Sequence, residues 1–410
     1  MVQMQASRYP MISAQSAIET ILAKTSVLNT EELALQAATG RVLAETVVAD
    51  DDMPPFAASA VDGYALRIDD GLAPRRVLSE IIAGSTAETT ITPGTAARIM
   101  TGAPLPPGAD AVIMVEQTSE RDGSVQIEEV PRQGDNVYPR GLDITGGQTV
   151  LIEGSNLGSA EIGLLATVGR TRVTVYRRPV VAILSTGDEL IEPDEPLRAG
   201  SIRDSNRYAL FGAILEAGGV PLSLGKVQDD ESAQEALIRE GLSQADVVLT
   251  SGGVSVGSRD LIKPILARIG TIHFGRIAFK PGKPTTFATV DNKLVFGLPG
   301  FPVSSLVSFE VFVRPALQKM QGRRRVHRPV VQATITHSLT PSADRTEFQR
   351  AQVHWSQGRL VAAATGAQRS SRLLSLVGAN ALLRIPPGGE AIPAGSLVEA
   401  HLVGDILEET

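Results

Sequence analysis

The sequence predicts a multidomain α/β protein with a doubly wound sheet at its centre and β-rich regions before and after that sheet. Residues 178–320 alternate apolar strand segments with helical segments, which is typical of a doubly wound parallel sheet. Residues 46–140 and 329–408 instead carry short apolar segments between Pro/Gly turns, which is typical of β domains. The 410 residues, 43% of them hydrophobic, are enough for two to four domains.

The elements before the central region are short. Ser13–Lys24 is predicted to be a helix capped by Ser13, and a second short helix is expected from Thr30 to Gly40. A helix over Ser159–Val168 ends at a glycine. Between them, strands are predicted at Ala60–Ile68, Val77–Ile82, Ala96–Met100, Asp110–Val115 and Val125–Val130.

In the central region the alternation is regular. Strands are predicted at Val180–Ser185, Val220–Val227, Asp246–Thr250, Ile272–Phe279 and Lys293–Leu298. Helices are predicted at Ser205–Ala217, Glu231–Ser243, Arg259–Ile269 and Val303–Met320. Sheets of this kind bind ligands at the carboxyl ends of their strands. The basic run 323–328 is interpreted as a solvated linker to the last, all-β region.

Composition excludes several classes of function. With 38 basic and 45 acidic residues the formal charge is −7, which argues against binding to nucleic acid or to an anionic membrane. The absence of cysteine excludes disulfides, thiolate chemistry and iron–sulfur clusters. No apolar run approaches the roughly 20 residues of a membrane span, and the N-terminus has no secretory signal, so a cytoplasmic protein is expected.

Three glycine-rich segments follow strands of the central region, at residues 185–190, 251–260 and 297–305. Such loops bring backbone N–H groups close to an anion. The glycines of any one loop are explained by the needs of a turn. Three such loops at one sheet edge favour a phosphate or nucleotide site, which would include Ser251, Gly252 and Gly253. The KPGKP segment, neither a P-loop nor a dinucleotide fingerprint, places Lys280 and Lys283 where they suit an oxyanion, although solvated turn lysines explain them equally.

Carboxylates gather at the same strand ends, namely Asp188, Glu189, Asp229, Asp230 and Asp260. The five histidines form no local metal motif, so a metal at a phosphate site would be held by oxygen ligands, which indicates Mg²⁺. The alternative is a purely structural role, in which each acid caps a helix or is solvated. This structural role is the preferred interpretation for Asp188 and Asp230. In the first β region, rigid turns present Asp62 and Thr101, for which a structural and a functional role are equally favoured.

These segments together resemble the molybdopterin molybdenumtransferase family, which includes the gephyrin E domain. The resemblance runs from about residue 10 to the C-terminus, more weakly over the last 80 residues, and is carried by PPFAASAVDGYA, IMTGAPLPPGADAV, RPVVAILSTGDEL, IRDSN, DVVLTSGGVSVGSRD, FKPGKP and GLPGFPVS. It implies four domains: a linking and dimerisation domain (1–45 and 144–177), a β-rich domain (46–143), an α/β domain resembling molybdopterin adenylyltransferase (178–326) and a C-terminal β domain (327–410).

The resemblance implies an enzyme of molybdenum cofactor synthesis. It would take adenylylated molybdopterin, release AMP and place molybdate on the dithiolene sulfurs with Mg²⁺. It would act as a homodimer whose site lies between the α/β domain of one subunit and the β-rich domain of the other. Further partners would be the molybdopterin adenylyltransferase and molybdoenzyme chaperones. Two alternatives stay open: a molybdopterin adenylyltransferase, in which the first β domain would have no task, and a non-catalytic dimeric scaffold, which the complete set of acids disfavours.

The family's functional positions map residue by residue. The catalytic set would be Asp62, Thr101, Asp143, Glu189, Asp229 and Asp260, of which Glu189, Asp229 and Asp260 would bind metal or orient water. The oxyanion and substrate set would add Lys280, Lys283, Pro299, Pro302, Arg350 and Ser370. The chain departs from the family where Phe301 replaces Asn and Arg369 replaces Gly. Because Phe301 would be the N-cap of the following helix, restoring Asn there is expected to stabilise the protein.

Overall fold

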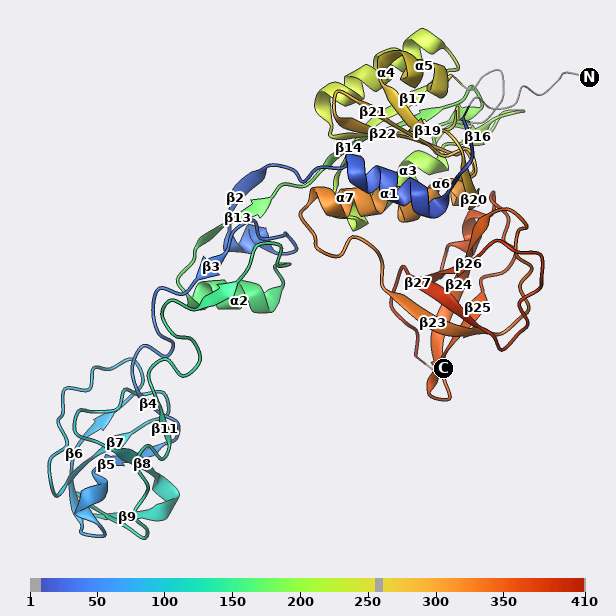
Figure 1. Cartoon of the computed structure of the whole chain (residues 1–410). Coiled ribbons are helices and arrows are strands. Elements are labelled where there is room, and N and C mark those ends of the chain that lie inside the picture. Colours follow the sequence, from blue (N-terminus) through green and yellow to red (C-terminus); the bar gives the residue numbers. More distant parts are fainter. Residues whose placement is uncertain (1–8, 255–260, 409–410) are drawn as a thin grey trace, which may run out of the picture. The chain divides into compact units, whose positions relative to one another are not determined.

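A computed structural model describes residues 9–254 and 261–408 of the chain. The chain divides into two compact units, one made of residues 33–173 and the other of the residues before 33 and after 173. The elements of both units are labelled in Figure 1. Asp260, one of the predicted site residues, lies outside the described residues.

The second unit contains the expected doubly wound sheet. Its strand order is β17-β14-β18-β22-β21-β19, formed by β14 (Val180–Thr186), β17 (Val220–Val227), β18 (Val247–Ser251), β19 (Thr271–Phe274), β21 (Thr286–Val290) and β22 (Lys293–Leu298). The first four strands in this order are parallel, so β14, β18 and β22 end at one edge. A two-stranded ladder, β15 (Leu190–Ile191) with β16 (Ile202–Arg203), follows β14.

Helices cover both faces of this sheet (Figure 1). One layer holds α1 (Ala14–Lys24), α3 (Ser205–Glu216), α6 (Pro302–Ser308) and α7 (Arg314–Met320), and the other holds α4 (Glu231–Gln244) and α5 (Ile262–Ile269). A π-helical turn, Phe309–Val313, joins α6 to α7. Strand β14 illustrates the two-residue period, since Val181 and Ile183 pack into the first layer while Ala182 and Leu184 pack into the second.

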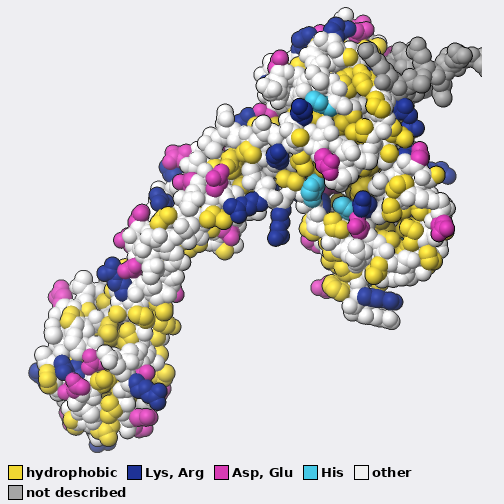
Figure 2. All heavy atoms as spheres, viewed as in Figure 1, with side chains coloured by type: hydrophobic (Ala, Val, Ile, Leu, Met, Phe, Trp, Pro, Cys, Tyr) yellow, Lys and Arg dark blue, Asp and Glu magenta, His cyan; other side chains and the backbone are white. Residues whose placement is uncertain are grey.

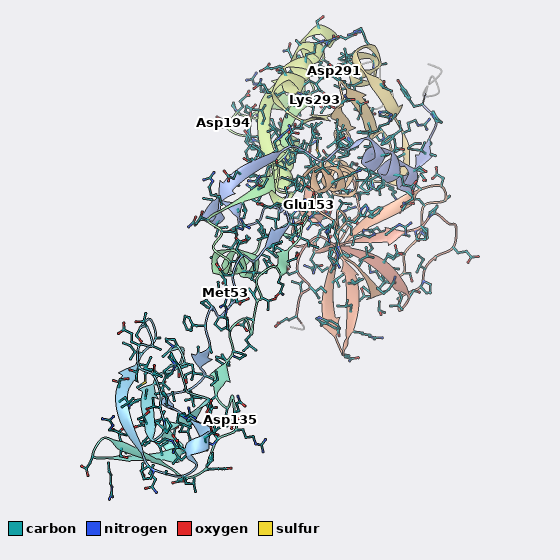
Figure 3. The ribbon with its side chains drawn as sticks, turned by 60° about the vertical axis from the view of Figure 1, so that its left-hand side comes forward. Met53, Asp135, Glu153, Asp194, Asp291 and Lys293 are labelled. Atoms are coloured by element: carbon teal, nitrogen blue, oxygen red, sulfur yellow. The ribbon has the colours of Figure 1, made fainter. Side chains whose placement is uncertain are left out.

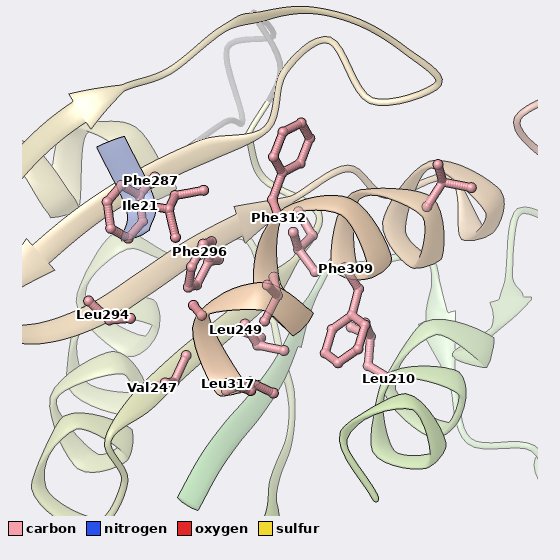
Figure 4. Close-up of a cluster of buried hydrophobic side chains, with 14 of the residues drawn as sticks. Ile21, Leu210, Val247, Leu249, Phe287, Leu294, Phe296, Phe309, Phe312 and Leu317 are labelled. Carbon is pink, nitrogen blue, oxygen red and sulfur yellow. The ribbon is translucent and has the colours of Figure 1, made fainter. Parts of the chain in front are cut away.

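The core of the first layer combines aliphatic side chains with several phenylalanines (Figure 4). Phe287 and Phe296 face each other across the β21–β22 ladder with ring centroids 4.9 Å apart. Phe309 and Phe312, on the π-helical turn, are also fully buried. Burying one such side chain is worth about 1.5–3 kcal/mol, so this cluster fixes the α6–α7 segment against the sheet.

The same unit continues into a closed β domain. Strands β23 (Val330–Ile335), β24 (Thr346–Ser356), β25 (Arg359–Ala364), β26 (Ala381–Ile385) and β27 (Leu397–Leu402) pair in the order β24-β25-β23-β27-β26, and β26 pairs back with β24. Two strands from outside extend this sheet, β20 (Ile277–Lys280) beside β24 and β1 (Ile12–Ser13) beside β20. The KPGKP segment is therefore tied directly to the β domain.

The first unit, residues 33–173, is built mainly on a six-stranded sheet in the order β8-β5-β7-β6-β10-β9. Its strands are β5 (Gly63–Leu66), β6 (Arg75–Ile81), β7 (Thr95–Ile99), β8 (Ala111–Met114), β9 (Thr118–Arg121) and β10 (Ser124–Ile127). Short ladders join β4 (Ala58–Ser59) to β11 (Val137–Tyr138) and β3 (Val47–Val48) to β12 (Thr149–Leu151), and α2 spans Ser159–Thr167. Strands β2 (Thr30–Ala34) and β13 (Arg172–Tyr176) lie where the chain passes between the units.

The prediction of the fold class is confirmed, but three local predictions are wrong. The segment from Thr30 is strand β2 followed by a short 3₁₀ helix (Leu35–Ala38), because the backbone stays extended through Ala34. The single strand predicted over 272–279 is two strands, β19 and β20, which belong to different sheets. The central sheet is not wholly parallel, since β21 runs antiparallel to both of its neighbours, β22 and β19. The turn from β21 to β22, where Figure 3 labels Asp291 and Lys293, has left-handed backbone angles at Asp291 and Asn292.

Charge is spread over the surface. On the face drawn in Figure 2, basic and acidic side chains are interspersed. The 323–328 run is only partly solvated, because the Arg328 guanidinium pairs with Glu310 at 2.5 Å. Across the described residues, none of the helices has the length and apolar character needed to cross a membrane.

Candidate active site

A pocket of about 590 Å³ lies at the edge where β14, β18 and β22 end. All three glycine-rich segments contribute to it, so we refer to it as the glycine-loop pocket. Its lining residues are Thr186, Gly187, Glu189, Leu190, Ile202, Arg203, Asp204, Ser205, Asn206, Asp229, Ser251, Gly252, Gly253, Val254, Pro284, Pro299, Gly300, Phe301, Pro302 and Ser304. Seven predicted site residues meet here: Glu189, Asp229, Ser251, Gly252, Gly253, Pro299 and Pro302.

The loop after β18 can only be built with glycine. Gly252 has a φ of +96°, and a Cβ atom there would lie 2.7 Å from the carbonyl oxygen of Thr186. A Cβ atom on Gly253 would lie 3.0 Å from the Thr186 hydroxyl oxygen. That hydroxyl is buried and has no hydrogen-bond partner among the described residues. Glycine at both positions therefore lets the loop pack directly against Thr186, beside a buried hydroxyl that still has hydrogen-bonding capacity.

Asn206, at the start of α3, connects two of the loops. Its amide nitrogen donates to the Ser251 hydroxyl at 2.7 Å and to the Gly300 carbonyl at 2.8 Å. The preceding Asp204 caps α3 by accepting from the backbone N–H of Arg207 at 3.1 Å. The IRDSN segment thus fixes the positions of the second and third glycine loops relative to each other.

Two carboxylates, Glu189 and Asp229, line this pocket from different strand ends. The Glu189 carboxylate folds over Gly187, where a Cβ atom would lie 2.5 Å from its Oε2. Asp229 lies at the opposite loop, and its N–H donates to the Asp188 carboxylate at 3.1 Å. Asp230 caps α4 by accepting from the Ala233 N–H at 2.8 Å, in agreement with the structural role preferred for it. Among the described residues no group of three metal-ligating side chains is assembled, so the metal site stays a prediction.

A second pocket, of about 560 Å³, adjoins the KPGKP segment and is strongly basic. We call it the basic pocket. It is lined by Lys280, Pro281, Gly282, Lys283, Pro284, Ser304, Arg345, Glu347, Arg350, Gln368, Arg369, Ser370 and Ser371. The predicted residues Lys280, Lys283, Arg350 and Ser370 therefore lie together, although they come from the α/β and the closed β domains. Five cationic side chains against one carboxylate make this a site for an oxyanion.

Arg350 is the buried cation of the basic pocket. It is 1% exposed, and its guanidinium donates from Nε to the Ser375 hydroxyl at 3.1 Å and from Nη2 to the Arg369 carbonyl at 3.2 Å. No carboxylate lies within ion-pair distance of it in the part of the chain that the structure describes. Burial lowers the pKa of Arg350 to about 10, which still leaves it charged at neutral pH. A buried cation with no carboxylate at ion-pair distance favours binding of an anion.

The two pockets share a wall. Pro284 and Ser304 line both of them. Near this wall, the backbone N–H of Val303 donates to the Ser370 carbonyl at 3.0 Å, which links the third glycine loop to the basic pocket. One elongated ligand with anionic groups can therefore contact both pockets at once.

The three remaining predicted residues belong to the first unit. Asp62 Oδ1 accepts from the backbone N–H and the hydroxyl of Thr101, both at 2.7 Å. These hydrogen bonds, the backbone bond most strongly, lower the pKa of Asp62. Asp143 is exposed, and its N–H donates to the Met53 carbonyl at 2.9 Å. The unit thus holds Asp62 and Thr101 in one fixed pair, with Asp143 in a separate loop.

Several pocket residues were not singled out from the sequence. Thr186 and Asn206 lie within the segments RPVVAILSTGDEL and IRDSN, which carry the family resemblance, so these segments already indicated that both residues belong near the site. Arg345 and Gln368 lie close in the chain to the predicted residues Arg350 and Ser370, but nothing in the pattern around either of them indicated a place in a pocket. Arg369 was noted only as a departure from the family pattern, and its side chain now takes a place in the basic pocket.

Comparison with known proteins explains this arrangement. Residues 12–169 match the family described as MoeA N-terminal region (domain I and II), residues 182–319 match a probable molybdopterin binding domain, and residues 332–403 match the MoeA C-terminal region (domain IV). The molybdopterin molybdenumtransferase of Bacillus subtilis is 36% identical over 91% of this chain and 90% of its own length. This chain belongs to the molybdopterin molybdenumtransferase family. The earlier resemblance is thereby confirmed.

Other members of the molybdopterin molybdenumtransferase family show the same relationship. The Haemophilus influenzae molybdopterin molybdenumtransferase is 37% identical over 92% of this chain and 95% of its own. Gephyrin of Dictyostelium discoideum is 36% identical over 98% of this chain, which spans 63% of the gephyrin length. The crystal structure of a molybdopterin biosynthesis MoeA protein from Pyrococcus horikoshii superposes with a TM-score of 0.85 at 32% identity, covering 97% of this chain and all of that one.

Proposed function

We propose that this chain inserts molybdate into adenylylated molybdopterin and releases AMP, as a step of molybdenum cofactor biosynthesis. The observation that carries the proposal is the wall of Pro284 and Ser304 shared by the glycine-loop pocket and the basic pocket. The reaction needs a phosphoanhydride and an oxyanion held side by side. Its relatives are named molybdopterin molybdenumtransferases.

Each pocket then has one task. The glycine-loop pocket holds the phosphoanhydride against the backbone of Gly252 and Gly253, while Glu189 or Asp229 orients the attacking water. The P–O bond to the adenylate breaks, and AMP leaves. The basic pocket holds molybdate near Lys280 and Arg350. When the two thiols bind molybdenum, their protons leave with one oxide as water, so no oxidant or reductant is needed.

A divalent cation, Mg²⁺, fits the donors of the glycine-loop pocket. Glu189 and Asp229 offer carboxylate oxygens, which are the ligands of a hard cation. They would hold it together with Asp260, which lies outside the described residues. When bound, it would neutralise charge on the phosphates. Glycine at 187 leaves room for the Glu189 carboxylate to fold over the loop.

We further propose a homodimer in which Asp62 and Thr101 serve the site of the other subunit. The support is that Asp62 and Thr101 form a rigid polar pair in one unit, whereas the lining residues of the glycine-loop pocket and the basic pocket all belong to the other unit. The cytoplasmic location, the adenylyltransferase and the chaperone partners stay predictions.

A turnover assay tests the main proposal. Purified chain is given adenylylated molybdopterin, molybdate and Mg²⁺, and both AMP and molybdenum-loaded cofactor are measured. The expected result is equimolar formation of both products. Formation of adenylylated molybdopterin from ATP and molybdopterin would instead identify an adenylyltransferase. A folded dimer with neither activity would identify a scaffold.

Mixing two inactive variants tests the shared site. The Asp62→Ala and Glu189→Ala chains are co-expressed and purified as a heterodimer through two different tags. One of the two active sites of this heterodimer should then be intact, and activity should return. Each variant homodimer, prepared in the same way, is the matched control. A heterodimer without recovered activity would show that Asp62 serves its own subunit.

A further inference from the structure

Phe301 occupies a position where its side chain does not cap the helix and lies mostly outside the core. It is the N-cap residue of α6, yet its side chain makes no capping hydrogen bond, and it is 60% exposed. A phenyl ring at an N-cap leaves unpaired the N–H groups that Asn would satisfy. The ring nevertheless lines the glycine-loop pocket. Its exposed surface therefore faces the space that the substrate would enter.

The backbone around Phe301 is held on both sides. The preceding Gly300 carbonyl accepts from Asn206 at 2.8 Å, and the carbonyl of Phe301 accepts from the Ser305 N–H at 2.9 Å. Two residues further, Val303 donates to Ser370 at 3.0 Å. A ring on such a fixed turn loses little conformational freedom when a ligand packs on it, which favours affinity.

A second apolar side chain lines the same pocket. Ile202, on β16, is 56% exposed, which leaves its apolar surface open to solvent like that of Phe301. Scattered exposed apolar residues need no explanation, but two of them in the wall of one pocket, together with Leu190 and Val254, form a place for an apolar or aromatic group. The anion-binding loops lie in the same pocket, so the complementary ligand joins a flat ring to a phosphate.

We propose that Phe301 is a specificity-determining residue that stacks on the planar heteroaromatic ring of the phosphate-bearing substrate. This inference rests on the proposed function, in which the substrate carries two such rings, adenine and pterin. Both present a π face to an aromatic side chain, and either ring can fill this role.

Binding measurements on the full-length chain test this inference. Calorimetric titrations use three probes: AMP, ribose 5-phosphate and pterin-6-carboxylate. Phe301→Leu keeps an apolar side chain but removes the π face, and Phe301→Tyr keeps the ring. Phe211→Leu is the matched control, because Phe211 is also partly exposed, at 39%, and does not line the pocket. Thermal melts check that every variant is folded.

The expected result is a loss of about five- to tenfold in affinity of Phe301→Leu for one ring-bearing probe, the lower end of the range for a lost base–aromatic stack because leucine keeps some apolar contact. Ribose 5-phosphate should bind unchanged, and Phe301→Tyr and Phe211→Leu should match the wild type. Loss with AMP would assign adenine to Phe301, and loss with the pterin would assign the pterin ring.

Equal affinities of wild type and Phe301→Leu for both ring-bearing probes would overturn the inference and leave the proposed function standing. A parallel loss with ribose 5-phosphate would also overturn it, because the variant would then have deformed the phosphate site. If the wild type binds neither AMP nor the pterin, the inference fails. The turnover assay then decides separately whether the proposed function fails too.

Discussion

The Nζ atom of Lys280 lies 3.1 Å from Oε1 of Glu347, and the two residues are also paired in register where β20 joins β24. Glu347 is almost fully buried and accepts further hydrogen bonds from the Gln349 amide at 3.2 Å and the Ser342 hydroxyl at 3.3 Å. The one carboxylate of the basic pocket thus holds a lysine of the α/β domain against the closed β domain. It also offsets part of the positive charge that attracts an oxyanion.

Replacing Glu347 with Gln should tighten oxyanion binding. The substitution removes one negative charge beside Lys280 and Arg350, so molybdate should bind about fivefold more tightly at low ionic strength. The gain should shrink in salt because the pocket is open to solvent. Calorimetry at two salt concentrations measures it, with Glu399→Gln, from the surface pair with Arg384, as control. Weaker binding by the variant would show that holding Lys280 in place outweighs the charge.

Replacing Arg350 with Met should abolish stabilisation by molybdate. In the wild type, saturation at 100 times the dissociation constant should add about 2.7 kcal/mol to the free energy of unfolding. The Met variant should gain almost nothing, because it lacks the buried cation that the anion neutralises. Thermal melts with and without molybdate measure this, and Arg384→Met, at an exposed ion pair, is the control. An undiminished gain in the Arg350 variant would remove Arg350 from the binding site.

Replacing Thr101 with Val should raise the pKa of Asp62. The backbone donor of Thr101 remains, so the pKa returns only part of the way to its ordinary value of 3.8. Because the folded-state pKa is lowered, the stabilisation is present above pH 3.8 and is lost as the pH falls through the folded-state value. Carboxyl NMR titration of Asp62 measures the shift, and Thr101→Ser should leave it near wild type. An unchanged pKa in the Val variant would contradict the hydrogen-bond account.

Replacing Phe301 with Asn should change stability less than capping alone predicts. The new cap contributes about 1 kcal/mol. The ring is 60% exposed, so losing its buried remainder costs roughly 0.6–1.2 kcal/mol, two fifths of the value for a fully buried Phe. We expect a net change within about 0.5 kcal/mol, measured by urea denaturation beside the wild type. A gain above about 1 kcal/mol would show that the ring contributes nothing to the folded state.

Local periodicity made much of the fold predictable. The alternation of Val181 and Ile183 with Ala182 and Leu184 identifies a strand buried on both faces, and the capping residue Ser13 identifies the start of α1. The antiparallel edge of the central sheet was not predictable in the same way. Strand β21 is short, and its place depends on the left-handed turn at Asp291 and Asn292 rather than on its own pattern.

The site was predictable where its residues lie in glycine-rich segments and unpredictable where distant segments meet. Glu189 and Gly252 follow strands whose ends must share one sheet edge. Arg350 lies in the middle of β24, and nothing in its neighbours in the chain indicates that it is buried with no carboxylate at ion-pair distance. Its place beside Lys280 follows from the pairing of β20 with β24, a contact across about 70 residues of chain that only the folded structure defines.

The most direct test of the two-pocket account is the rate of AMP release in a single turnover, measured with and without molybdate. Wild type and Arg350→Met are each mixed with less than one equivalent of adenylylated molybdopterin and quenched over time. The account predicts that molybdate accelerates AMP release at least tenfold in the wild type and has no effect on the variant, which still binds AMP normally. A wild-type rate that does not depend on molybdate would contradict it.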